Sequence, residues 1–264
     1  MTEASEKDID NIILYLKENI QDCIYMYIDI KKYRLNNPAM KVWVDKDCNN
    51  QIKFVIMKYH TGISLFSTDE EIPKKDLANL IEQNNPGSIT GKRNLIEKLQ
   101  PFFTSKYYVE YGFIFKFERF HDFGGYDLIE KATVADALDI ARLVASDSDI
   151  GAYYDIEDLA CQFQERMRSQ MGRSYIIRDA GKIIGHIATY AELDDIATTS
   201  GLKVDPAYEG HMLGAVLESY IVHQMLEEGF KLYTFVMSKK RCRLLKNMGN
   251  PIVGEYGKMI KIEA

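Results

Sequence analysis

Apolar residues recur along this chain with two periods, and each period predicts one kind of element. Spacings of three and four residues, as in Ile9, Ile12, Ile13 and Leu16, are typical of helices that bury one face. Helices are expected over residues 6–32 (as one helix or two), 74–83, 92–99, 134–145, 155–171, 213–228 and 239–248. Alternating patterns and short apolar runs predict strands over residues 40–45, 51–60, 63–67, 107–117, 128–130, 175–178, 182–190, 195–204, 231–237 and 252–262. This mixture of elements predicts an α+β fold.

Turn-forming and capping residues mark the ends of several predicted elements. Asp179-Ala180-Gly181 separates two strand patterns and is a strong hairpin signal. Gly229 is expected to end a helix, because glycine adopts left-handed backbone conformations without steric cost. Thr133 is expected to cap the helix that follows it.

Length and composition are those of a globular protein with one large domain or two ordinary ones. The chain has 264 residues, of which 46% are hydrophobic, and 33 basic against 39 acidic side chains give a net charge of −6. A mildly acidic chain argues against a dedicated nucleic-acid-binding protein. His121–Tyr126, with two glycines, is the best linker, so the predicted domains are residues 1–124 and 125–264.

Targeting and redox signals point to an ordinary intracellular protein. No apolar run is long enough to span a bilayer, and the first five residues lack signal-peptide character, so a cytoplasmic protein without membrane contact is expected. The four cysteines are widely spaced and form no CxxC pair, which predicts reduced thiols and no metal site.

The segment Gly201–Leu217 carries the clearest functional signal. It is predicted to form a strand, a turn at Asp205-Pro206 and the start of a helix. Gly210 and Gly214 would let the backbone approach a ligand closely. The first turn of a helix carries unpaired N–H groups and partial positive charge, so this turn is suited to phosphate oxygens. The alternative is an ordinary strand-to-helix turn that binds nothing.

This order of strand, glycine-containing turn and helix resembles the acyl-CoA loop of the GNAT superfamily of N-acyltransferases. Gly185–Glu192 and Leu244–Glu255 also resemble family segments, and the likeness extends from about Tyr126 to Ala264. It implies a mixed, mostly antiparallel sheet flanked by helices. The first half has the same order of elements, which indicates a degenerate GNAT-like copy and a two-domain, tandem arrangement.

The resemblance implies acetyl-CoA as acyl donor and assigns its binding to the loop and to the start of a later helix. The implied residues are Leu202, Lys203, Val204, Glu209, Gly210, His211, Met212, Leu213, Gly214, Ala215, Ser238 and Arg241. Glu209 stands where the family has Gln or Arg, and Met212 where it has Gly. The acidic run Ser67–Glu71 occupies the matching turn of the first half, so that half is not expected to bind coenzyme A.

Transfer of an acyl group to an amine requires loss of the ammonium proton, whose ordinary pKa is near 10. The resemblance makes Glu192, just before the central strand, the candidate base, with Asp194 and Asp195 as rivals. A solvated acidic turn is the alternative interpretation of these residues. His186 and His211 are further candidate bases, although a histidine on a strand is more often packed and hydrogen-bonded.

The general acid cannot be the residue that the family pattern implies. Leu245 replaces the family's tyrosine, so Tyr256 on the last strand becomes the candidate, with a core tyrosine as the alternative. The predicted function is an N-acyltransferase that uses acetyl-CoA on a small-molecule amine, without a metal. The departures at Glu209, Met212 and Leu245 favour the alternative, an inactive GNAT-fold acyl-CoA sensor or interaction protein. A homodimer is compatible with the sequence.

Overall fold

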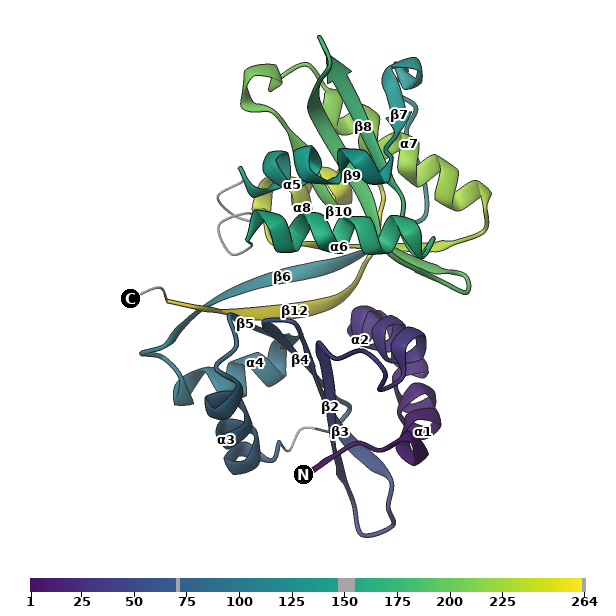
Figure 1. The fold of residues 1–264 in the computed structure, drawn as a ribbon. Helices are drawn as coiled ribbons and strands as arrows, with labels where there is room; N and C mark the ends of the chain where they lie inside the picture. Colours follow the sequence, from purple (N-terminus) through teal and green to yellow (C-terminus); the bar gives the residue numbers. More distant parts are fainter. Residues whose placement is uncertain (70–71, 147–154, 263–264) are drawn as a thin grey trace. The chain divides into compact units, whose positions relative to one another are not determined.

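The computed structural model describes residues 1–69, 72–146 and 155–262, and the chain divides into two compact units (Figure 1). The first unit comprises Met1–Ile114, Val236–Cys242 and Ile252–Ala264. The second unit comprises Phe115–Phe235 and Arg243–Pro251.

The first unit contains a sheet with helices on both of its faces. Its strands are β1 (Thr2–Glu3), β2 (Met40–Lys46), β3 (Ile52–Tyr59), β4 (Gly62–Ser67), β5 (Ser88–Lys92) and β12 (Ile252–Lys261), in that order across the sheet. Among the described strands of this unit, β4 and β5 pair in parallel and the other neighbours are antiparallel. Its helices are α1 (Glu6–Lys17), α2 (Ile20–Tyr33), α3 (Lys74–Asn84) and α4 (Arg93–Leu99). The first two lie on one side of β2–β4 and the other two on the opposite side (Figure 1).

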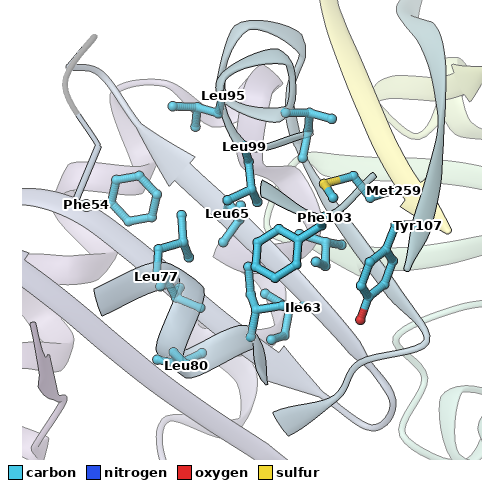
Figure 2. Close-up of a cluster of buried hydrophobic side chains, with 14 residues drawn as sticks. Phe54, Ile63, Leu65, Leu77, Leu80, Leu95, Leu99, Phe103, Tyr107 and Met259 are labelled. Atoms are coloured by element: carbon cyan, nitrogen blue, oxygen red, sulfur yellow. The ribbon is translucent and has the colours of Figure 1, made fainter. Parts of the chain in front are cut away.

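A packed hydrophobic cluster fills the space between this sheet and the helices α3 and α4. Figure 2 shows Phe54 and Leu65 from the strands facing Leu77 from α3 and Leu95 from α4. Met259 of β12 closes the cluster and is fully buried. Aliphatic and aromatic side chains therefore occupy the interior of this unit beside β4 and β5.

Two features of this unit differ from the sequence prediction. The strand β5 was not expected, because Ile89 is the single large apolar side chain among its five residues. The predicted division at residue 124 also differs from the compact units, because β12 pairs with β5 from Tyr256 to Ile260. This long-range pairing returns the last strand to the first unit, and no local pattern encodes it.

The second unit is built on five strands in the order β7 (Ile129–Lys131), β8 (Ser174–Asp179), β9 (Lys182–Leu193), β10 (Ile196–Val204) and β11 (Lys231–Val236). All neighbours are antiparallel except β10 and β11. The helices are α5 (Ala137–Ala145), α6 (Ile156–Arg168), α7 (Leu213–Glu227) and α8 (Lys239–Asn247). The strands β6 (Tyr107–Phe117) and β11 and the helix α8 each contain a point where the chain passes between units. The structure confirms the predicted α+β fold with a mostly antiparallel sheet flanked by helices.

Two helical layers cover opposite faces of the second sheet. The His186 ring on β9 packs edge-on against Phe163 of α6, with ring centroids 5.2 Å apart. A Cβ atom at the preceding residue, Gly185, would lie 3.0 Å from Leu217 of α7. Because successive strand residues point to opposite faces, α6 and α7 lie on different sides of β9. Among the described residues, no helix is long and apolar enough to cross a membrane.

The predicted caps and turns are confirmed in this unit. The Thr133 N–H and hydroxyl both donate to the Asp136 carboxylate, at 2.7 and 2.8 Å, in a capping box that precedes α5. Gly181 closes the β8–β9 hairpin with φ +83° and Gly229 follows α7 with φ +84°. Positive φ is costly for residues with a side chain, so glycine is favoured at both positions.

Candidate functional site

The end of β10 separates from β11 and leaves a gap in the sheet of the second unit. The two strands pair in parallel only from Ile196↔Lys231 to Thr199↔Thr234. The strand β10 continues to Val204 and stays with β9, since the Asp205 N–H donates to the Ile184 carbonyl at 2.8 Å. Backbone groups of successive strand residues point to opposite edges, so the Val204 N–H faces away from β9, toward the gap.

A bulge in β10 accompanies this separation. Ser200 pairs with Ala188 and Lys203 pairs with His186, so β10 holds one residue more than β9 across this interval. Gly201 lies in the interval with φ +66°, and its carbonyl accepts a 2.8 Å hydrogen bond from His186 Nδ1. This bulge was not predicted, although an isolated glycine within a strand pattern, such as Gly201, is a known signal of one.

The turn after β10 is anchored to the β8–β9 hairpin. Asp205 accepts the Ala207 N–H at 3.0 Å, which starts the short helix Pro206–Tyr208. Its carboxylate also pairs with Lys182 at 2.6 Å. The Tyr208 hydroxyl donates to Asp179 in the hairpin turn. These contacts fix where the loop leaves the sheet.

The first turn of α7 presents backbone N–H groups at the end of this loop. The Met212 carbonyl accepts from Ala215 and Val216, at 2.9 and 3.0 Å. The N–H groups of Leu213 and Gly214 precede these and have no carbonyl one turn earlier to bond. Gly214 lies against the end of β10, because a Cβ atom there would be 3.6 Å from Val204 Cγ2. The helix start is thereby held next to the gap.

The two residues that depart from the family pattern leave this turn open. Met212 adopts a left-handed φ of +60° and its side chain is 57% exposed, so it points to solvent. Glu209 is also exposed. A Cβ atom at Gly210, with φ +87°, would meet no atom within 4 Å. The turn therefore has room for a phosphate group, although Glu209 adds a negative charge beside it.

Glu192 lies in an ion-pair network rather than in an open site. Its two oxygens accept hydrogen bonds from Arg173 Nε and Nη2, at 2.9 and 2.8 Å, and the Thr189 hydroxyl also donates to it. Arg173 further pairs with Glu228 at 2.6 Å, and the hydrogen bonds that it donates to Glu228 and Glu192 raise the pKa of Arg173. These contacts give Glu192 a structural role that the sequence did not suggest, and its assignment as a base stays a prediction.

The other candidate bases differ in their distance from the ligand loop. Asp195 pairs with Lys231 at 2.7 Å, and Asp194 occupies a turn with φ +54°. His186 is fully buried, and burial lowers its pKa to about 4. His211 is exposed at the ligand loop, with Nδ1 3.1 Å from the Tyr208 carbonyl. Of these residues only His211 lies on the loop itself.

Three predicted site residues, Ser238, Arg241 and Tyr256, belong to the first unit. Tyr256 is 6% exposed on β12, and burial raises its pKa, which suits a core tyrosine rather than a proton donor. The Ser238 hydroxyl accepts the Arg241 N–H at 3.4 Å, so it caps the start of α8. Leu245, where the family has tyrosine, is fully buried in the second unit.

A cavity of about 320 Å³ lies between α5 and Asp205, the residue that follows β10. Its charged lining residues form two ion pairs, Arg142 with Asp139 at 3.1 Å and Lys182 with Asp205 at 2.6 Å. Because each cation is already neutralised by a neighbour, this cavity offers weaker recognition of an anion than the α7 turn.

Comparison with known proteins supports the fold and one domain. Residues 139–249 match the family model described as the acetyltransferase (GNAT) family, and this part of the chain is a GNAT acetyltransferase domain. No curated protein matches the sequence at a significant level.

Solved structures share the whole two-domain architecture. A Drosophila protein aligns with a TM-score of 0.70 at 14% identity, over 98% of this chain and 97% of its own. A GCN5-related N-acetyltransferase from Sphaerobacter thermophilus aligns at 0.63 and 12% identity, over 100% and 95%. A tandem GNAT protein from the clavulanic acid biosynthesis pathway aligns at 0.61 and 9% identity, over 100% and 98%. These likenesses establish the tandem GNAT fold.

Proposed function

We propose that the second unit binds an acyl-CoA and transfers its acyl group to a small-molecule amine, with acetyl-CoA as the leading donor. The observation that carries the proposal is the separation of β10 from β11 after Thr199, followed further along the chain by an open helix start at Leu213. The end of β10 thus offers a gap for the extended arm of an acyl-CoA, and the turn that follows the strand offers a place for its pyrophosphate. A GNAT domain at residues 139–249 agrees with this use. The proposal retains the expected cytoplasmic location.

The donor would be held mainly by backbone groups. The N–H groups of Leu213 and Gly214 would bind pyrophosphate oxygens, helped by the positive end of the α7 dipole. In the gap, the Leu202 and Val204 N–H groups would face the thioester carbonyl and stabilise negative charge on its oxygen. Backbone donors tolerate sequence change, so Glu209 and Met212 are compatible with the proposed site.

The chemistry requires a neutral amine. When bound, the thioester supplies an activated carbonyl, on which a C–N bond forms and a C–S bond breaks, with coenzyme A leaving as the thiol or thiolate. Glu192 is engaged by Arg173, so we propose that the acceptor loses its proton to water rather than to that residue. The protein's contribution is then to hold donor and acceptor together and to stabilise the oxyanion.

We propose that the first unit binds no acyl-CoA. The Tyr15 hydroxyl accepts the Thr68 N–H at 2.9 Å and donates to the Lys53 carbonyl at 2.8 Å, so the turn after β4 is bonded to the protein itself. The acidic Glu70 and Glu71 of the same turn lie outside the described residues. The expected stoichiometry is one acyl-CoA per chain.

Calorimetric titration of the purified protein with acetyl-CoA, and separately with free coenzyme A, is the direct test. Micromolar binding of both at one site, together with release of free thiol when amines are added, supports the proposal. No heat and no thermal shift at millimolar ligand would reject acyl-CoA binding outright.

A second candidate function is binding of acyl-CoA without turnover, as in a sensor or an interaction protein. Two observations favour it. Glu192 is held by Arg173, and the candidate acid Tyr256 is buried in the core of the first unit. Acetyl-CoA binding without thiol release across a broad panel of amines would identify this alternative.

A further inference from the structure

We infer that His186 is a positioning residue, whose imidazole holds β10 in the bulged shape that opens the gap for the acyl-CoA. The inference rests on the proposed function, because it assigns the shape of the same site to one side chain. His186 contacts neither the loop nor the α7 turn in this role and acts through the backbone of Gly201.

The bulge combines a glycine, Gly201, with the His186 ring that packs against it. Gly201 has a left-handed φ of +66°, a conformation that residues with side chains rarely adopt. A Cβ atom there would lie 3.2 Å from His186 Cε1 and 3.4 Å from Nδ1, so the ring occupies the space that a side chain would need. The absence of a side chain at Gly201 is thus matched to the ring on the neighbouring strand.

The hydrogen bond between them fixes the chemical form of the imidazole. The Gly201 carbonyl can only accept, so His186 Nδ1 must carry a proton and donate. Burial favours the neutral ring, and its pKa falls to about 4. Nε2 is then an unprotonated acceptor, and it has no hydrogen-bond partner among the described residues. A buried acceptor without a partner costs folding free energy, and the hydrogen bond at Nδ1 offsets part of that cost.

This bond takes the place of a strand ladder contact. Pairing of β10 with β9 is interrupted between Ser200 and Lys203, and the His186 side chain satisfies a carbonyl inside that interval. Pairing of β10 with β11 has already ended at Thr199, two residues earlier. The imidazole therefore stabilises the segment in which β10 bends away, and with it the direction of the Leu202 and Val204 N–H groups.

A purely space-filling role for His186 makes different predictions from a positioning role. Its ring packs edge-on against Phe163, so an apolar residue could fill the same volume. Asparagine places its Nδ2 donor near the position of His Nδ1, whereas leucine has no donor and glutamine extends its amide toward the Nε2 position. Rescue by asparagine but not by leucine or glutamine is therefore specific to the hydrogen bond.

The test compares His186→Asn, His186→Leu and His186→Gln with the wild type by calorimetry with acetyl-CoA and by amide NMR. We expect His186→Leu and His186→Gln to lose about tenfold or more in affinity and His186→Asn to stay within about threefold of the wild type. The Gly201–Val204 amide shifts should move in the first two variants and stay in the third. Unchanged affinity and shifts in a folded His186→Leu variant would overturn the inference.

Nitrogen NMR of the wild-type imidazole adds a readout that needs neither a variant nor a ligand. The neutral ring is expected with its proton on Nδ1, and a proton on Nε2 would overturn the inference even if every variant failed to fold. If the wild type bound no acetyl-CoA, the proposed function would fail. The tautomer and the amide shifts would still decide whether His186 shapes β10.

Discussion

Arg173 donates two parallel hydrogen bonds to the Glu192 carboxylate, from Nε at 2.9 Å and from Nη2 at 2.8 Å. The Arg173 side chain is 18% exposed and that of Glu192 only 9%, so the pair is largely withdrawn from water. The same guanidinium reaches Glu228 after the end of α7. One cation thus ties the entry to β8, the end of β9 and the end of α7 together.

Glu192→Gln should destabilise the protein rather than remove a catalytic base. Removing one partner of a largely buried pair costs about 3 kcal/mol. Turnover measured well below the melting temperature should stay within a few-fold of the wild type. Glu228→Gln is the matched control, because Glu228 is 42% exposed and should cost about 1 kcal/mol or less. Urea unfolding and thiol release measure both effects, and loss of turnover at unchanged stability would restore Glu192 as the base.

Gly214→Glu should abolish acetyl-CoA binding while leaving the fold intact. The substitution brings bulk and negative charge to the helix start proposed to hold the pyrophosphate. Gly214→Ala is the control, because its Cβ would meet Val204 at an ordinary contact distance of 3.6 Å. Calorimetry should show about wild-type affinity for the alanine variant and no binding for the glutamate variant. Equal affinities would mean that the pyrophosphate lies elsewhere.

Glu209→Gln should strengthen acetyl-CoA binding, by about threefold at low salt. The substitution removes a like charge beside the proposed pyrophosphate site, and the gain should shrink as salt rises because exposed charges are screened. Glu227→Gln, about 20 Å away at the other end of α7, is the control and should leave affinity unchanged. Titrations at two salt concentrations measure the effect. A loss of affinity in Glu209→Gln would argue that the acid makes a favourable contact with the ligand.

The rate of acyl transfer should follow the ionisation of the acceptor. If water takes the proton, the log of kcat/KM should rise with unit slope below the amine's own pKa, near 10 for an alkylamine. The profile should shift to lower pH for amines of lower pKa. Rate profiles with two amines of different basicity check this. An inflection near pH 6 to 7 that is common to both amines would instead identify a base in the protein, with His211 the first to mutate.

Acid should unfold the first unit through Asp8. Lys46 at 2.6 Å and Ser5 at 2.7 and 2.8 Å lower the pKa of Asp8 from 3.8 to about 2. A lowered pKa means that the ionised form stabilises the fold above pH 4, and this contribution, about 2 kcal/mol, disappears as the pH falls from 4 to 2.

Asp8→Asn should lower the free energy of unfolding at pH 7 by about this amount. In this variant the contribution of residue 8 to that free energy should no longer change between pH 4 and 2. The only tryptophan, Trp43 on β2, gives a fluorescence signal for this unit alone. Asp10→Asn is the control, because the Asp10 side chain is 83% exposed and its pair with Arg34 should contribute little. Equal acid transitions in the two variants would contradict the assignment.

The sequence predicted the elements well because their signals are local. The turn at Gly181, the helix end at Gly229 and the capping box at Thr133 each depend on residues a few positions apart. The α7 turn was identified in the same way, from two glycines after a strand. Contacts between distant residues could not be predicted in this way. Arg173 meets Glu192 across two strands, and no spacing in the sequence reveals that the carboxylate is engaged.

The burial of Tyr256 could not be predicted for a related reason. Its strand pairs with β5, more than half the chain away, and this partner sets the burial of the ring. The strand β5 itself has few apolar residues and is stabilised by its neighbours on both sides. Non-local pairing of this kind leaves no periodic pattern for a sequence analysis to detect.

The return of β12 to the first unit sets an order of events on the ribosome. The edge of β5 is made early, but its partner residues Tyr256–Ile260 lie more than half the described chain further on and are synthesised much later. Until they emerge, the first unit carries an unpaired strand edge and a core without Met259. Both segments of the second unit, Phe115–Phe235 and Arg243–Pro251, precede these residues in the chain. The nascent chain therefore has to protect this open edge while the whole second unit is made, and the first unit can complete its sheet only afterwards.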